Sequence, residues 1–153
     1  MNRLAHAIAP LVVLSLMAAK PAHAEPPAAR FRPVQLYIDS GSQPLAAYQV
    51  EIVVTSGDAR IVGIEGGEPP AFRSAPYYDP AALKGGRIII AAFNTGDQLP
   101  SGKARVATLH MEESGPGTPV YQATLKAAAT SNGKPIDARV WITPDGSKEE
   151  EKK

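Results

Sequence analysis

Hydrophobic and polar positions alternate with a period of two along most of the chain after residue 33. The clearest example is residues 48–54, in which every second side chain is apolar. Such alternation predicts a β-strand with one buried side, because successive side chains point to opposite faces of a sheet. Apolar segments of strand length, separated by turn residues, cover residues 34–38, 48–54, 60–64, 87–93, 103–112, 120–129 and 136–142.

Turn chemistry separates these segments, and no amphipathic helix is apparent. Asn132-Gly133 is the strongest turn signal, because this pair accepts positive φ at both central positions of a tight hairpin. The Pro- and Gly-rich residues 68–85 read as a long loop with room for one short strand or helical turn. Seven or eight short strands predict an all-β fold in which two antiparallel sheets pack as a sandwich.

The segment 87–93 is apolar on both sides. If Ile88 and Ile90 face the core, Ile89 and Ala91 face outward together with Phe93, where alternation normally places polar groups. Two explanations remain open. Either the loop over residues 68–85 covers this outer side, or an exposed apolar sheet face meets a partner.

Aromatic side chains give a second candidate site. Phe72, Tyr77 and Tyr78 lie in the Pro-rich loop, and Trp141 lies in the last predicted strand, opposite its inward positions. Rings in such a loop either plug the open end of the sandwich or stack on sugars. Tyr77, Tyr78 and Trp141 are therefore the candidate carbohydrate-binding residues.

Both ends of the chain read as segments outside the folded domain. Residues 1–24 have a basic start, an apolar stretch and a small-x-small ending at Ala22-His23-Ala24, which predicts a signal peptide. We therefore expect export to the periplasm or beyond the cell, with no membrane insertion after cleavage. Residues 25–33 are expected to be an extended linker, residues 34–142 the domain, and residues 143–153 a disordered charged tail.

The composition of the chain argues against several classes of function. Without residues 1–24, 14 of the 16 basic side chains face 15 acidic ones, so no basic excess attracts nucleic acid. The chain has no cysteine, and His110 is the one histidine left, so neither a catalytic triad nor a transition-metal site is expected. We predict no catalysis, no cofactor and no metal, although whether calcium is bound stays open because several Asp residues lie in turns.

The order of several segments resembles that of a cohesin domain, the family of scaffold modules that bind dockerins. The segments that carry this resemblance are Leu45-Ala-Ala-Tyr-Gln-Val-Glu-Ile52, Ile61-Val-Gly-Ile64, Gly86-Arg-Ile-Ile-Ile-Ala91 and Gly102-Lys-Ala-Arg-Val-Ala-Thr-Leu109. The resemblance covers roughly residues 34–142 and rests on strand patterning.

The resemblance implies a jelly-roll sandwich of about nine strands in which one flat sheet face receives the partner. Carried over by position, and in agreement with the outward set that alternation gives, the expected protein-binding residues are Gln49, Glu51, Ile89, Ala91, Val106, Thr108 and His110.

The sequence therefore predicts an exported, non-catalytic binding module with a protein partner, and the resemblance implies that this partner is dockerin-like. The alternatives are a carbohydrate-binding module, with a polysaccharide as ligand, and a structural subunit of a cell-surface assembly.

Overall fold

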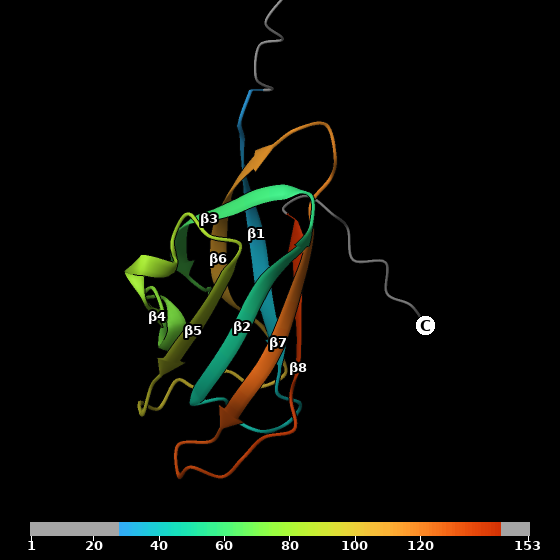
Figure 1. The fold of residues 1–153 in the computed structure, drawn as a ribbon. Coiled ribbons are helices and arrows are strands. Elements are labelled where there is room, and N and C mark those ends of the chain that lie inside the picture. Colours follow the sequence, from blue (N-terminus) through green and yellow to red (C-terminus); the bar gives the residue numbers. More distant parts are fainter. Residues whose placement is uncertain (1–27, 145–153) are drawn as a thin grey trace, which may run out of the picture.

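The computed structural model describes residues 28–144, which form two packed antiparallel sheets of four strands each (Figure 1). Sheet A has the strand order β3 (Asp58–Gly66), β6 (Lys103–Ser114), β1 (Arg30–Asp39) and β8 (Arg139–Pro144). Sheet B has the order β4 (Tyr77–Tyr78), β5 (Arg87–Phe93), β2 (Ala47–Ser56) and β7 (Val120–Ala129). The described residues contain no α-helix, so the predicted all-β sandwich is confirmed at this level.

The core lies between the sheets and is built from the alternate apolar positions of the strands. In β1, Val34, Leu36 and Ile38 are fully buried, while Gln35 and Tyr37 between them are partly exposed. The same period recurs in the other central strands, which contribute Val50, Ile52, Ile88, Ile90, Leu109 and Met111 to this core. Burial of alternate side chains, which the sequence predicts, therefore holds the two sheets together.

The strands pair in a nested order, like the two arms of one long hairpin. The first strand pairs with the last, β2 with β7, β3 with β6, and β4 with β5. Two further pairs, β1 with β6 and β2 with β5, join these into the two sheets. Because partners in sheet A alternate in sequence with partners in sheet B, the chain crosses between the sheets at most connections.

A β-bulge in β6 changes which side chains face the core. Leu36 pairs with Ala107 but the next residue, Tyr37, pairs with Arg105, so Val106 is the extra residue. Val106 and Ala107 are consequently both fully buried, although they are neighbours in one strand. The carbonyl oxygen of Val106 accepts a hydrogen bond of 3.2 Å from the buried Tyr48 hydroxyl, which links the two sheets.

The loop over residues 68–85 covers one lateral edge of the sandwich, between β3 of sheet A and β5 of sheet B (Figure 1). It contains β4 and two 3-10 turns, η1 (Pro70–Phe72) and η2 (Pro80–Ala82). Phe72 is buried against the edge of the Tyr48 ring, with 5.2 Å between the ring centroids. Phe72 is therefore a core residue that fills the sandwich beneath the loop, and its ring is not available to stack on a sugar.

The domain boundaries differ slightly from those expected. Residues 30–33, expected to be part of a linker, extend β1 at its start and pair with residues 110–113 of β6. Thr143 and Pro144, expected in the tail, belong to β8. The predicted signal peptide and residues 145–153 lie outside the described residues, and residues 28–144 contain no helix long and apolar enough to cross a membrane.

Candidate functional site

The seven residues expected to form one protein-binding face lie on two different sheets. Gln49 and Glu51 of β2 and Ile89 and Ala91 of β5 belong to sheet B. The other three, Val106, Thr108 and His110, belong to β6 in sheet A. The prediction that these seven residues form a single face is therefore wrong. Alternation fixes the side to which a side chain points, but it does not fix the sheet that its strand joins.

Val106 is also not on an outer face. Its exposed fraction is 0%, because the bulge in β6 turns it toward the core. Thr108 does face outward from sheet A, but it is buried beneath two neighbouring side chains, Arg105 and Gln35. Neither residue is accessible to a partner, so the prediction that Val106 and Thr108 are protein-binding residues is wrong.

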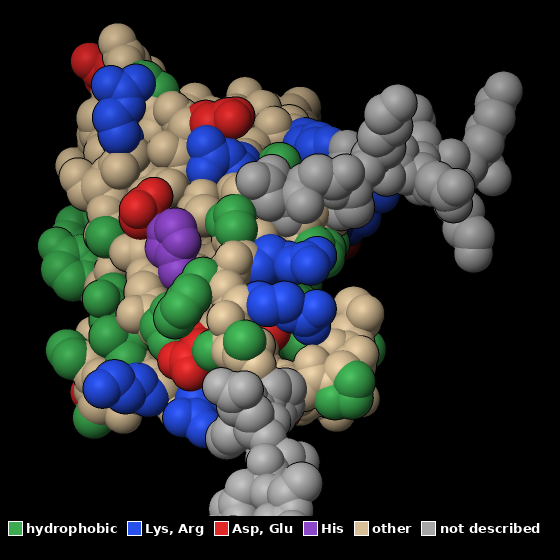
Figure 2. Space-filling model, turned by 90° about the horizontal axis from the view of Figure 1, so that it is seen from above, with side chains coloured by type: hydrophobic (Ala, Val, Ile, Leu, Met, Phe, Trp, Pro, Cys, Tyr) green, Lys and Arg blue, Asp and Glu red, His purple; other side chains and the backbone are tan. Residues whose placement is uncertain are grey.

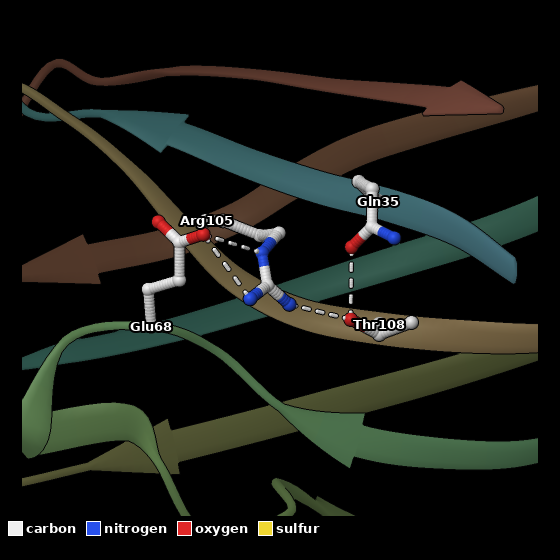
Figure 3. A network of polar contacts seen from close by, with 4 residues as sticks. All are labelled: Gln35, Glu68, Arg105 and Thr108. Atoms are coloured by element: carbon white, nitrogen blue, oxygen red, sulfur yellow. Dashed lines mark hydrogen bonds and ion pairs between the residues drawn. The ribbon is translucent and has the colours of Figure 1, made fainter. Parts of the chain in front are cut away.

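Thr108 belongs to a chain of polar contacts that ties the loop to sheet A (Figure 3). Arg105 donates from Nε and Nη2 to Glu68 Oε1, each at 3.3 Å, and from Nη1 to Thr108 Oγ1 at 2.6 Å. Thr108 Oγ1 donates in turn to Gln35 Oε1 at 2.8 Å. Because the contacts join residues of the loop, β6 and β1, this network fixes the loop against sheet A.

His110, the one histidine among the described residues, lies partly exposed on the outer side of sheet A (Figure 2, purple). Its Nε2 is 3.1 Å from Glu65 Oε1, although the angles do not make this contact a hydrogen bond. Basic and acidic side chains are interspersed around it (Figure 2). Because His110 is the one histidine among residues 28–144, no second imidazole of the described chain lies beside it.

The outer face of sheet B has an apolar end formed by two exposed rings and small side chains. Tyr77 of β4 and Phe93 of β5 are 69% and 68% exposed, and their rings lie nearly parallel with centroids 6.1 Å apart. The loop over residues 68–85 joins the edge of this sheet through β4 and leaves Phe93 uncovered. An exposed apolar patch of this kind is therefore present on the sheet face.

A trough of about 260 Å³ lies beside the two rings. Its floor is made of small side chains, because Ala47 lies between Phe93 and Ala129, and Gln49 lies between Ala91 and Ala127 in the next row. The exposed Gln49 amide makes no hydrogen bond within the described residues. We call the trough, Tyr77 and Phe93 together the aromatic trough.

The other end of the same face carries charge. Glu51 Oε1 accepts a hydrogen bond of 2.6 Å from Arg87 Nε, and Glu51 Oε2 is 2.6 Å from Lys126 Nζ. The hydrogen bond from Lys126, and then that from Arg87, lowers the pKa of Glu51 below its ordinary value, so this carboxylate is ionised at neutral pH. We call these three residues the charged cluster.

The three candidate carbohydrate-binding residues do not form one site. Tyr77 belongs to the aromatic trough, whereas Tyr78 is half-buried against the core. Trp141 lies on sheet A, where its ring stacks on Tyr37 with centroids 5.5 Å apart and the Lys103 ammonium group lies 5.6 Å from its centre. Only Tyr77 of the three presents an exposed ring to the outer face of sheet B.

Sequence reasoning placed Phe93 outward but omitted Arg87 and Lys126 from the site. Arg87 and Lys126 can be assigned to the site only when the register of three strands is known, since Arg87 contacts Glu51 from β5 and Lys126 contacts it from β7. Opposite charges on separate strands carry no local signal in the sequence.

A larger groove of about 630 Å³ lies between the end of β7 and residues 133–138. It contains no exposed aromatic ring, so it lacks the anchor residues that mark the aromatic trough. No group of three or more His, Asp or Glu side chains within residues 28–144 could hold a metal ion.

Comparisons with protein-family models, curated proteins and solved structures find no significant match to this chain.

Proposed function

We propose that the chain is an exported, non-catalytic binding module that recognises a protein partner through the outer face of sheet B. The observation that carries this proposal is the pair of exposed rings, Tyr77 and Phe93, beside the trough. Aromatic side chains at the centre of an apolar patch are the residues that most often dominate the binding energy of protein interfaces.

Burial of the two exposed rings by a partner would lower the free energy of the complex. Each ring is about two-thirds exposed, so burying the remaining surface would contribute about 1 to 2 kcal/mol per ring. The charged cluster borders the apolar end on the same face, as the polar rim of an interface does. An apolar region with a charged region beside it is therefore available on one face without any rearrangement of the strands.

The proposal includes a cohesin-like jelly roll and a cleaved signal peptide. The nested pairing of eight strands in two sheets supports the jelly roll, since such folds pack eight strands in two sheets. Resemblance to cohesins implies one flat sheet face as the recognition surface, and sheet B is the face that carries the exposed rings. The basic, apolar and small-residue order of residues 1–24 supports export.

The test compares proteins captured by the tagged wild-type domain with those captured by a Tyr77→Ser, Phe93→Ser double variant, using quantitative mass spectrometry on the envelope fraction of the source cells. We expect the double variant to lose the partners that the wild type enriches. Phe31→Ser is the matched control, because Phe31 is 72% exposed but lies on sheet A. Equal capture by the wild type and the double variant would contradict the proposal.

A glycan is the second candidate ligand of the same face. An exposed tyrosine ring next to the unpartnered Gln49 amide offers both a surface for a sugar ring and a group for its hydroxyls. Electrophoresis of the domain through gels that contain a soluble polysaccharide would test this alternative. Retardation that depends on Tyr77 and Phe93, without any captured protein, would favour the glycan over the protein partner.

A further inference from the structure

The charged cluster exposes positive charge and conceals its negative charge. The side chains of Arg87 and Lys126 are 62% and 42% exposed, whereas that of Glu51 is 15% exposed. Both carboxylate oxygens of Glu51 are occupied, Oε1 by Arg87 and Oε2 by Lys126. The cluster therefore carries a net charge of +1, and the groups that meet solvent are the two cations.

The neighbouring outward side chains of sheet B do not change this balance. The residues beside Glu51 in its row are Ile89 and Thr124, and the next row contains Val53 and Gln122 together with Arg87 itself. None of these neighbours in β2, β5 and β7 is acidic. The exposed carboxylate at the edge of the same row is that of Asp79, which directly follows β4 beyond Ile89 and whose Oδ1 accepts a hydrogen bond from the Ala81 N–H. A like-charged basic partner would be repelled here, and an acidic partner would be attracted.

The cluster lies at a fixed distance from the aromatic trough. Ala47 forms part of the trough floor and Glu51 follows four residues later in the same strand. At about 3.3 Å per residue, the two ends of the face are about 13 Å apart. A ligand that reaches from the far end of the trough to the cluster spans this distance, whereas Gln49, at the near end of the trough, lies two residues, or about 7 Å, from Glu51.

We propose that the protein partner is acidic. It places an apolar side chain in the aromatic trough and one or more Asp or Glu side chains, about 7 to 13 Å away, against Arg87 and Lys126. This inference rests on the proposed function of sheet B and adds the charge of the partner to it. The exposed cations increase the rate of encounter and exclude basic partners, while the two rings provide most of the affinity.

A random peptide library displayed on phage, selected on the wild-type domain, provides the probe. The inference predicts that enriched peptides contain an aromatic or large aliphatic residue together with Asp or Glu. Binding of the synthetic peptide with the highest enrichment is then measured by calorimetry. We expect its Kd to rise about tenfold in an Arg87→Gln, Lys126→Gln double variant, as expected for two exposed ion pairs.

Two further measurements separate charge from other effects. Glu51→Gln raises the net charge of the cluster to +2, so this variant should bind the peptide more tightly than the wild type. Arg30→Gln with Arg60→Gln removes two exposed arginines from sheet A and should leave the Kd unchanged. Raising the salt concentration should weaken binding by the wild type more than binding by the Arg87, Lys126 double variant.

These experiments distinguish a failure of the acidic-partner inference from a failure of the proposed function of sheet B. If peptides are enriched without acidic residues, or if the Arg87, Lys126 double variant binds like the wild type, the inference is overturned. The proposed function still stands in that case if Tyr77→Ser with Phe93→Ser abolishes binding. If that aromatic variant, shown to be folded by circular dichroism, binds the peptide like the wild type, the proposed function fails as well.

Discussion

At the scale of single residues, a buried carboxylate connects the two sheets. Glu113 of β6 is 3% exposed, and its Oε1 accepts a hydrogen bond of 2.6 Å from the Tyr121 hydroxyl of β7. Arg32 Nε lies 3.6 Å from its other oxygen. Burial, and then the hydrogen bond to Glu113, raises the pKa of Tyr121, so this hydroxyl keeps its proton and acts as a donor.

The variant Tyr121→Phe should therefore destabilise the domain by about 1 to 3 kcal/mol, because it leaves a buried carboxylate without its hydroxyl donor. Urea unfolding followed by tryptophan fluorescence measures the change. Tyr37→Phe is the control, since the Tyr37 hydroxyl makes no hydrogen bond within the described residues. Equal losses in the two variants would show that the contact with Glu113 contributes nothing.

At the scale of elements, the bulge in β6 decides what the strand exposes. Val106 has polar or small neighbours and alternates with apolar positions, so its pattern indicates an outward side chain. The extra residue shifts the alternation by one position, and the side chain faces the core instead. A one-residue register shift moves a side chain from one side of a sheet to the other.

Val106→Lys tests this placement. We expect a loss of about 3 kcal/mol or more in the free energy of unfolding, because an unpaired ammonium group would replace a fully buried side chain. Gln49→Lys, at an exposed position of β2, should change stability by less than about 0.5 kcal/mol. Thermal unfolding measures both, and a tolerated Val106→Lys would contradict the inward orientation of the bulge.

The sequence pattern predicts the strands better than it predicts the surface that they form. β5 and β7 have the expected bounds, because their apolar runs end at clear turn residues. β8 begins at Arg139, three residues later than expected, since Ile136 is buried outside the strand. The sheet to which β6 belongs depends on pairing between residues far apart in the sequence, so the pattern within a strand does not contain it.

At the scale of the whole molecule, surface ion pairs make stability depend on pH. The backbone N–H of Gly41, and then the side chain of Arg139, lowers the pKa of Asp39, as the charged cluster lowers that of Glu51. A carboxyl group with a lowered pKa binds its proton less readily in the folded state than in the unfolded state. Its stabilising contribution is therefore complete above its ordinary pKa and is lost as the pH falls.

We expect the urea midpoint to be constant near neutral pH and to fall as the pH decreases below about 4.5, the ordinary pKa of a glutamate. An Asp39→Asn, Glu51→Gln double variant should show a flatter decline, because two of the groups that take up protons on unfolding are absent. The measurement is the urea midpoint at several values between pH 7 and pH 3. Parallel curves for the two proteins would exclude a role for these carboxylates.

The pairing of β1 with β8 has a consequence for the chain ends. Val34 lies opposite Pro144, so the described chain enters and leaves sheet A through adjacent strands, about 5 Å apart. Figure 1 shows this end of the sandwich opposite the end where β2 begins and β5 finishes. A short linker could therefore join residue 144 to residue 28, with new ends opened at residues 115–119, in a circular permutant of the described domain that keeps every strand pair. The domain can likewise be anchored to a support through residues 28 and 144, while the aromatic trough, at the opposite end of sheet B, stays away from the support.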